Sequence, residues 1–311
     1  MRLLVLGAGG IGGYFGGRLA AAGADVTFLV RPGRAMQLAR DGLVIRSPTG
    51  DLTHPVRFIG GDGLADEGRF DAVLLTCKAY DLEAALAALA PAVVHGAAIV
   101  PLLNGVRHLE RLDFAFGRSA VLGGLCQIAT TLTRTGEVLH LSRLHLLMLG
   151  ARAANQRSLV EGFATVAQSA NFESRTSDDI AQDMWEKFVM LASMAAMTCL
   201  MRANVGEIMQ TDEGEGLMLE ALSECDLVAR AAAHPSPPEF LERARSLLTE
   251  RGSSFAASML RDVERGGATE AAHFIGDMVV RSREAGLTAP VLRMAGCHLQ
   301  AHAARQRAGR A

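Results

Sequence analysis

The sequence predicts an α/β N-terminal domain followed by an all-α C-terminal domain. In the first half, apolar segments of strand length alternate with segments of helical period, which is typical of a parallel sheet covered by helices. After about residue 178, nearly every segment has helical period. The 311 residues suit two domains, because one domain averages about 100–200 residues. We therefore expect domains at residues 1–175 and 176–311.

The composition argues against several classes of protein. Half of the residues are apolar, 21% are charged and the formal net charge is −2, unlike a disordered chain or a basic nucleic-acid binder. The longest apolar run, residues 188–201, is shorter than the ~20 residues of a membrane span. We therefore expect a core helix there and no membrane segment. The strand that begins at Arg2 leaves no room for a signal peptide, and five cysteines without a CxxC pair favour a reducing, cytoplasmic location.

A glycine-rich turn joins the first predicted strand, residues 2–6, to a helix that ends near Ala22, and a second strand follows at 25–30. The turn consists of Gly7, Ala8, Gly9, Gly10, Ile11 and Gly12. In a βαβ unit, the first glycine of such a motif permits a tight turn, the second a close approach to pyrophosphate and the third close helix packing. Free N–H groups at the helix start favour a phosphate. The motif at this position predicts a dinucleotide site, with a purely structural turn as the alternative.

The end of the second strand bears on which dinucleotide binds. NAD sites usually carry Asp or Glu there, bonded to the ribose 2′-hydroxyl, whereas this chain carries Arg31. A guanidinium suits a 2′-phosphate, because it makes charge-assisted and bidentate bonds. We therefore expect NADP(H) rather than NAD. A solvated loop arginine is the alternative for Arg31, and it is the interpretation that we favour for Arg34.

Two polar residues follow later strands of the predicted sheet. Lys78 comes after the strand at 71–75, and Asn104 comes after the strand at 97–100. Ligands of parallel sheets bind beyond the carboxyl ends of the strands, so both residues are candidates for the same site. The alternatives are a surface lysine and an Asn-Gly turn residue with positive φ.

The remaining elements complete the expected fold. Strands at 43–46 and 56–59 and a helix ending near Ala90 belong to the first half, together with antiparallel extensions of the sheet at 120–131 and 137–149, a helix at 155–170 and a short strand at 171–174. Helices are expected at 179–201, 213–233, 236–251, 255–265, 269–285 and 289–307.

Lysine is rare in this chain, since 29 of the 31 basic residues are arginines and only Lys78 and Lys187 are lysines. Lys187 begins the apolar stretch and could supply the proton that carbonyl reduction requires; a snorkelling lysine is the alternative. Ser258 and Glu270 supply a hydroxyl and a carboxylate, although a glutamate there also suits the first turn of a helix. A metal site is not expected, because His298 and His302 have no carboxylate partner in sequence.

Taken together, these stretches resemble the ketopantoate reductase (2-dehydropantoate 2-reductase) family. The matching pieces lie in the family's order and spacing from residue 1 to about 290, and both lysines fall inside them. The pieces are residues 7–12, 76–78, 103–105, 185–187, 202–207, 258–262 and 269–270.

The resemblance implies a Rossmann-type domain, an all-helical second domain, NADPH in the cleft between them and a small-molecule 2-oxo acid as substrate. It identifies Lys187 with the family's proton-donating lysine. The contacts that it further implies are Asn104 with cofactor and substrate, Lys78 near the cofactor, Ser258 with substrate, Glu270 with substrate or cofactor, and the main chain of Ala129 with cofactor. The helical half of this chain is rich in Met and Ala, which is compatible with a homodimer.

The chain departs from the family pattern on the helix of Lys187. The family usually carries asparagines four and eight residues after the lysine, where this chain has Leu191 and Ala195. Two amide partners, worth about 0.5–1.5 kcal/mol each, are therefore absent. We expect reduction of 2-dehydropantoate to pantoate. A divergent member that reduces another 2-oxo acid or ketone, and a non-catalytic NADPH-binding sensor, are the alternatives.

Overall fold

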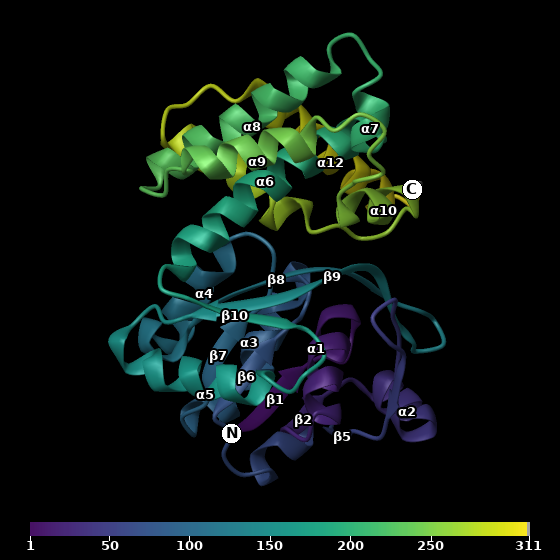
Figure 1. The fold of residues 1–311 in the computed structure, drawn as a ribbon, viewed down its shortest axis with the longest axis vertical. Helices are drawn as coiled ribbons and strands as arrows, with labels where there is room; N and C mark the ends of the chain where they lie inside the picture. Colours follow the sequence, from purple (N-terminus) through teal and green to yellow (C-terminus); the bar gives the residue numbers. More distant parts are fainter. Residues whose placement is uncertain (310–311) are drawn as a thin grey trace. The chain divides into compact units, whose positions relative to one another are not determined.

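Five short apolar strands form the parallel sheet of the N-terminal half, in the order β5-β2-β1-β6-β7 (Figure 1). The strands are β1 (Arg2–Leu6), β2 (Asp25–Leu29), β5 (Arg57–Ile59), β6 (Ala72–Leu75) and β7 (Ala98–Pro101). The central strand β1 pairs in parallel with β2 and with β6. Its side chains Leu3, Leu4 and Val5 are fully buried, as expected for a strand covered on both faces. The predicted α/β class and the parallel sheet are confirmed.

The computed structural model describes residues 1–309, apart from the side chains at positions 62 and 65. It divides into two compact units, Met1–Ala181 and Gln182–Ala311. The division falls in the first turn of helix α6 (Ile180–Met201). The boundary expected from the sequence, between residues 175 and 176, lies within strand β10 (Glu173–Ser177).

A second sheet in the same unit has the order β10-β9-β3-β4, with β8 beside β9. Its other strands are β3 (Leu43–Arg46), β4 (Leu52–His54), β8 (Gly123–Leu132) and β9 (Val138–Gly150). The predicted antiparallel pair is present as β8 and β9. The pair belongs to the second sheet because β9 pairs with β3 and β10. The predicted segment also meets the parallel sheet at its start, where Val121 forms an isolated parallel bridge with Ile99 of β7. The strand predicted at 43–46 belongs to this second sheet.

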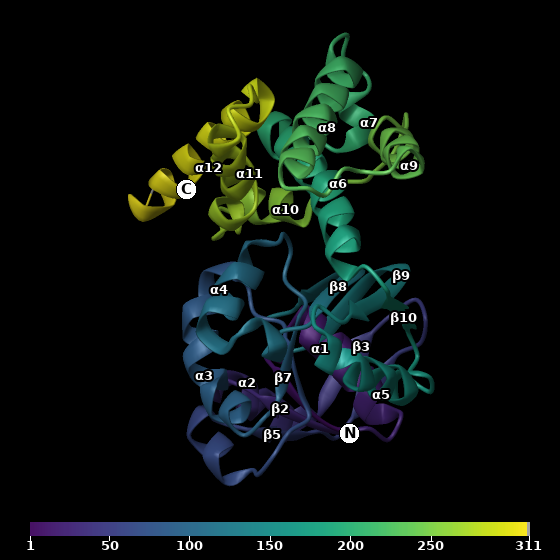
Figure 2. The same ribbon diagram turned by 90° about the vertical axis from the view of Figure 1, so that its left-hand side faces the viewer.

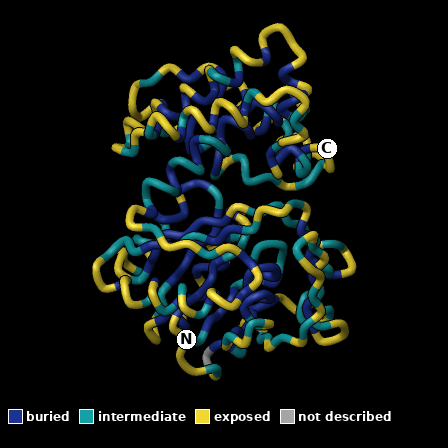
Figure 3. Tube along the Cα trace, in the orientation of Figure 1, coloured by how far each residue is buried: buried dark blue, intermediate teal, exposed yellow. Residues whose placement is uncertain are grey.

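Helix α1 (Gly10–Ala21) lies between the two sheets, in contact with β1 and β2 on one side and with β3, β8 and β9 on the other. Glycines permit this double contact: Gly16 faces the ring of Phe28, and Gly17 faces Leu43, at distances where a Cβ atom would collide. Figure 3 shows the buried trace running along the strands and α1. The position of α1, and with it the glycine turn, is thus fixed from both sides.

Other helices cover the outer faces of this unit. They are α2 (Pro32–Asp41), α3 (Leu82–Val94), α4 (Arg107–Phe116) and α5 (Arg157–Ala167). Helices α3 and α4 pack against each other (Figure 2), and α5 packs on β9 and β10. Helices α2 and α4 were not predicted from the sequence. Each is short, and α2 buries a single side chain, Leu38, so its apolar signal is weak.

A polar network ties α1 to the second sheet. The hydroxyl of Tyr14 lies 2.7 Å from Nδ1 of His145 and 3.3 Å from Oγ1 of Thr49. Ser47 Oγ lies 2.8 Å from the Thr49 hydroxyl and 2.9 Å from Nδ1 of His140. The two imidazole rings stack with centroids 5.6 Å apart. Burial lowers the pKa of both histidines, and a positive charge on His140 lowers that of His145 further. The packing therefore disfavours the charged form of both imidazoles.

The second unit is helical throughout its regular structure. Its helices are α6, α7 (Val205–Ile208), α8 (Gly214–Ala231), α9 (Pro238–Leu248), α10 (Ser258–Glu264), α11 (Ile275–Glu284) and α12 (Pro290–Arg307). Helices α8, α11 and α12 pack together. The buried carboxylate of Glu224 on α8 accepts the N–H groups of Val291 and Leu292 at 3.0 and 2.9 Å. It thereby satisfies the first turn of α12, whose N–H groups have no partners within the helix.

Helix α6 is long and apolar enough to cross a membrane by length and composition, but 67% of the apolar window is buried inside the protein. Its two hydroxyls are satisfied within the helix, since Ser193 donates to the carbonyl of Val189 and Thr198 to that of Met194, both at 2.7 Å. Such burial and back-bonding are typical of a core helix.

We predict that acid weakens the N-terminal unit through His140 and His145. Their folded pKa values lie below the ordinary 6.5, so the unfolded chain binds more protons and stability is lost as pH falls below about 6.5. Urea unfolding at pH 7.5 and 5.5 should show a smaller loss for His145→Asn than for the parent chain. The control His95→Asn, at an exposed position after α3, should behave like the parent. An equal acid loss in the His145 variant would contradict the assignment.

Candidate functional site

The glycine turn leads directly from β1 into α1. Gly7 has φ +93°, a conformation that favours glycine. A Cβ atom on Gly12 would collide with the carbonyl oxygen of Gly7 and with the hydroxyl of Thr76. That hydroxyl donates to the carbonyl of Leu6 at 2.8 Å. The absence of side chains at these positions therefore lets α1 start against the ends of β1 and β6.

The N-terminus of α1 is open for an anion. Its N-cap is Gly9, and among the described residues no side chain caps it and no acid lies in its first turn. A Cβ atom on Gly9 would meet nothing within 4 Å. Unpaired N–H groups and the helix dipole favour a negative group at such a terminus. The turn is thus closely packed at Gly12 and has free space at Gly9, as the sequence motif predicts.

Three further candidates lie at neighbouring strand ends of the same sheet edge. Arg31 follows β2 and is the exposed N-cap of α2. Lys78 follows β6 and is the exposed N-cap of the short helix η2 (Ala79–Asp81). Asn104 follows β7 and is partly buried, and it is Gly105 that takes the positive φ of 79°. The Asn-Gly turn therefore does not need Asn104 for its conformation, which removes that alternative.

Ala129 lies at an irregularity of β8. Ile128 pairs with His145 and Thr130 with His140, so that residues 141–144 stand opposite Ala129 alone. The neighbouring side chain of Thr130 packs on the start of α1, because a Cβ atom on Gly10 would lie 2.8 Å from its hydroxyl oxygen. The structure thus brings Ala129 next to the segment that touches the glycine turn.

Arg34 makes contacts that the sequence did not predict. Its Nε donates to the carbonyl of Ala8 at 2.8 Å, and Nη1 donates to the carbonyl of Gly136 at 2.7 Å. Burial lowers the pKa of the guanidinium. The interpretation as a solvated loop arginine is wrong, because the side chain links α2, the glycine turn and the β8–β9 turn. No local pattern could have signalled these contacts, whose partners are 26 and 102 residues away in sequence.

In the second unit, Lys187 lies on α6 and is partly buried. Its neighbour Phe188 packs on Phe274, with ring centroids 5.0 Å apart, so the segment after Glu270 lies against α6. Glu270 is the partly buried N-cap of a short helix, η5 (Ala271–His273).

Ser258 is exposed and begins α10, whose N-cap residue Ala257 donates its N–H to Thr198 of α6 at 3.5 Å. The unit thus attaches the segments of Ser258 and Glu270 to the helix of Lys187.

The face of α6 that carries Lys187 continues with Leu191 and Ala195. Residues four apart lie on one helix face, and α6 is continuous over all three positions. Leu191 is partly buried and Ala195 is buried. The expected departure from a polar face is therefore a real feature of this helix.

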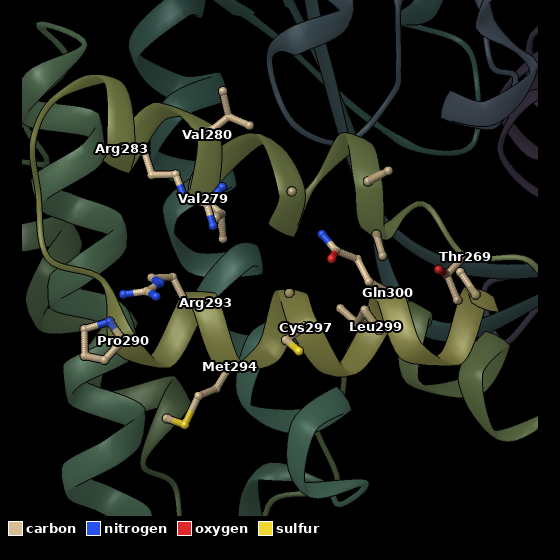
Figure 4. A pocket seen from close by; sticks show the side chains of 15 residues that line it. Thr269, Val279, Val280, Arg283, Pro290, Arg293, Met294, Cys297, Leu299 and Gln300 are labelled. Atoms are coloured by element: carbon tan, nitrogen blue, oxygen red, sulfur yellow. The ribbon is translucent and has the colours of Figure 1, made fainter. Parts of the chain in front are cut away.

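A separate apolar groove of about 700 Å³ lies between α11 and α12. Figure 4 shows the side chains of Val279 and Arg283 on α11 directed toward α12, where Arg293 and Cys297 lie. Lys187, Ser258 and Glu270 do not line this groove. Among the described residues, no group of three or more His, Cys, Asp or Glu side chains could hold a metal ion.

Comparison with known proteins gives a consistent result. The model described as "Ketopantoate reductase PanE/ApbA" matches residues 3–153, and the model of the C-terminal part of the same family matches residues 179–303. A Bacillus subtilis (strain 168) protein, "Uncharacterized oxidoreductase YkpB", is 37% identical over 98% of this chain and 99% of its own length.

Two solved structures extend the comparison. A 2-dehydropantoate 2-reductase from Geobacter metallireducens GS-15 is 26% identical, with a TM-score of 0.86 over 96% of this chain and 99% of its own. A D-mandelate dehydrogenase solved with NADH and anilino(oxo)acetate has a TM-score of 0.88 at 18% identity, covering 99% of both chains, which is a likeness of fold.

We predict that Arg34→Ala weakens the binding of NADH and NADPH equally. The side chain supports the main chain of the turn rather than one coenzyme, and hydrogen bonds from a charged group are worth about 1.5–3 kcal/mol. Affinities measured by the fluorescence of the reduced nicotinamide should fall about 3- to 10-fold, a cost of roughly 1 kcal/mol. The control Arg40→Ala removes an exposed arginine of the same helix that pairs with Asp41. A loss confined to NADPH would instead make Arg34 a 2′-phosphate ligand.

Proposed function

Because the chain belongs to the ketopantoate reductase family, we propose that it catalyses the NADPH-dependent reduction of a 2-oxo acid. The first candidate substrate is 2-dehydropantoate, which would be reduced to pantoate. The observation that carries the proposal is the glycine turn of residues 7–12. A side chain at Gly12 would collide with neighbouring atoms, whereas Gly9 has free space beside it. The turn leads into the N-terminus of a helix, which favours a phosphate.

The residues of the first unit fit a nicotinamide dinucleotide. The turn formed by Gly7, Ala8, Gly9, Gly10, Ile11 and Gly12 would hold the pyrophosphate through main-chain N–H groups. Arg31 would bind the 2′-phosphate through its guanidinium, and Lys78 would add positive charge at the next strand end. Asn104 would orient ribose and substrate carbonyl, and the main chain of Ala129 would contact the cofactor. The bound cofactor supplies a hydride to the substrate carbonyl carbon.

Lys187 is proposed to donate the proton to the carbonyl oxygen. An ammonium next to a developing alkoxide stabilises the negative charge before the proton moves, and the effect grows where water is excluded. Its partly buried place on an apolar helix suits that role. Ser258 and Glu270 would bind the distal groups of the substrate, and Glu270 would also contact the cofactor.

Leu191 and Ala195 favour a second candidate substrate class. They continue the face of α6 that carries Lys187, and both side chains lack hydrogen-bonding groups. A 2-oxo acid with an apolar side chain would match this face better than the hydroxyl-bearing 2-dehydropantoate, because a polar substituent without a partner costs about 1–3 kcal/mol of desolvation. A panel of 2-oxo acids distinguishes the two.

We predict that Arg31→Ala weakens NADPH far more than NADH. The guanidinium would contact the 2′-phosphate, which NADH lacks, and a charge-assisted contact of about 1.5–3 kcal/mol corresponds to roughly 10- to 100-fold in affinity. Titration of both reduced coenzymes by fluorescence measures the two losses. A uniform loss would reject the 2′-phosphate assignment.

We predict that the purified protein oxidises NADPH in the presence of at least one 2-oxo acid, and that Lys187→Ala removes this turnover. Loss of absorbance of the reduced nicotinamide, followed over a panel that includes 2-dehydropantoate and 2-oxo acids with apolar side chains, measures the rate. The lysine variant should lose about 10²–10⁴-fold in kcat, with its NADPH affinity largely unchanged. Met201→Ala, at the exposed end of the same helix, is the control.

The outcomes separate the candidate functions. Binding of NADPH without oxidation by any panel member favours a sensor over an enzyme. Equal loss of turnover and NADPH affinity in Lys187→Ala makes the lysine a residue of cofactor retention. Partial rescue of Lys187→Ala by added methylammonium supports the proton donor, since the free cation supplies the same group.

A further inference from the structure

The guanidinium of Arg31 forms an ion pair that the sequence did not suggest. Its Nη2 lies 3.0 Å from Oδ1 of Asp81, with side-chain exposures of 77% and 34%. We propose that Asp81 sets the coenzyme preference of this protein by competing with the 2′-phosphate of NADPH for Arg31. The proposal rests on the proposed function only in taking Arg31 as the 2′-phosphate ligand.

The topology explains how these two residues meet. Arg31 follows β2, and Asp81 ends the short helix η2 that follows β6. Strand β1 lies between β2 and β6 in the sheet, so the two loops flank the carboxyl end of β1, where the glycine turn begins. The ion pair therefore bridges the two loops on either side of the turn. A carboxylate is held at the same rim as the guanidinium that would receive the phosphate.

The charges decide the direction of the effect. A phosphate monoester carries about −1.5 to −2 charges at pH 7, so NADPH must displace the Asp81 carboxylate from Arg31. The loss of this ion pair penalises NADPH. NADH carries a hydroxyl at this position, which can donate to a carboxylate as in ordinary NAD sites. Asp81 therefore lowers the preference for NADPH that Arg31 alone would give.

Two further cations, Arg34 and Lys78, belong to the same edge of the sheet. Arg34 uses Nε and Nη1 on the carbonyls of Ala8 and Gly136, while its buried Nη2 has no hydrogen-bond partner among the described residues. Lys78 precedes Asp81 by one turn, and its carbonyl accepts the N–H of Asp81 at 2.9 Å, which fixes the main chain that carries the carboxylate. An exposed ion pair of this kind contributes little to folding, so removing it tests coenzyme choice rather than stability.

The test is the variant Asp81→Asn, with dissociation constants for NADPH and NADH measured by the fluorescence of the reduced nicotinamide. NADPH affinity should rise about 3- to 10-fold, as expected when an opposing charge is removed from a binding site. NADH affinity should stay the same or fall. An unchanged ratio of the two affinities, or weaker NADPH binding, overturns the proposal, the latter because Asp81 would then hold Arg31 in place for the phosphate.

Two controls make the result specific. Glu83→Gln removes a carboxylate two residues away that pairs with Arg111 at 2.7 Å, so it changes the net charge equally and should leave the coenzyme ratio unchanged. In an Arg31→Ala background, Asp81→Asn should no longer raise the affinity for NADPH, because a double-mutant cycle isolates the coupling between the two residues. A rise that persists there would show direct repulsion of the phosphate and overturn competition for Arg31.

Failure of this inference and failure of the proposed function give different results. A parent chain that binds neither coenzyme contradicts the proposed function. A parent chain that binds both, with a ratio that Asp81→Asn does not change, contradicts the inference alone.

Discussion

The close approach of α1 to the ends of β1 and β6 is the constraint on which the candidate site depends. It exists because Gly12 has no side chain to collide with the Gly7 carbonyl and the Thr76 hydroxyl. The first turn of α1 consequently lies at the edge of the parallel sheet where the loops after β2, β6 and β7 begin. Arg31, Lys78 and Asn104 share this edge because each follows the carboxyl end of a strand of the parallel sheet. A bulkier residue at position 12 would push the helix away, and the phosphate-binding terminus would lose its position relative to those loops.

The second sheet packs against the helix that follows the glycine turn. Strands β3, β8 and β9 of this sheet contact the side of α1 that faces away from the parallel sheet. The polar network of Tyr14, His140 and His145 further attaches the helix to this sheet. The sequence predicted the antiparallel pair but made it an extension of the parallel sheet. Two neighbouring strands with alternating apolar and polar residues are expected to pair with each other. The pattern does not show which further strand joins them, and here β9 pairs with β3, about 90 residues away in sequence. That choice is made by the packing of α1, whose Gly13 and Gly17 meet Val138 and Leu43.

Much of the fold and part of the site could be predicted from the sequence. The strands and long helices were predictable because their apolar residues repeat with a period that burial requires. Gly7, Gly9 and Gly12 were predictable because the motif carries its own local geometry. Arg34 and Asp81 were not, because each acts through a partner brought near by tertiary structure: Arg34 through the Ala8 carbonyl and Asp81 through Arg31. Helix α2, which contains Arg34 and has Arg31 as its N-cap, was not predicted because Leu38 is its only buried residue.

Under the proposed function, cofactor and substrate recognition are encoded differently in this chain. The dinucleotide would be bound by main-chain shape, which Gly7 and Gly12 determine. The substrate would be bound at one face of α6, where the side chains of Lys187, Leu191 and Ala195 decide which groups find partners. The hydroxyls of Ser193 and Thr198 on that helix donate to carbonyls one turn back and so need no partner from a ligand. A chain that uses arginine almost everywhere else has kept lysine at position 187, where a compact charge able to give up a proton differs in kind from a guanidinium.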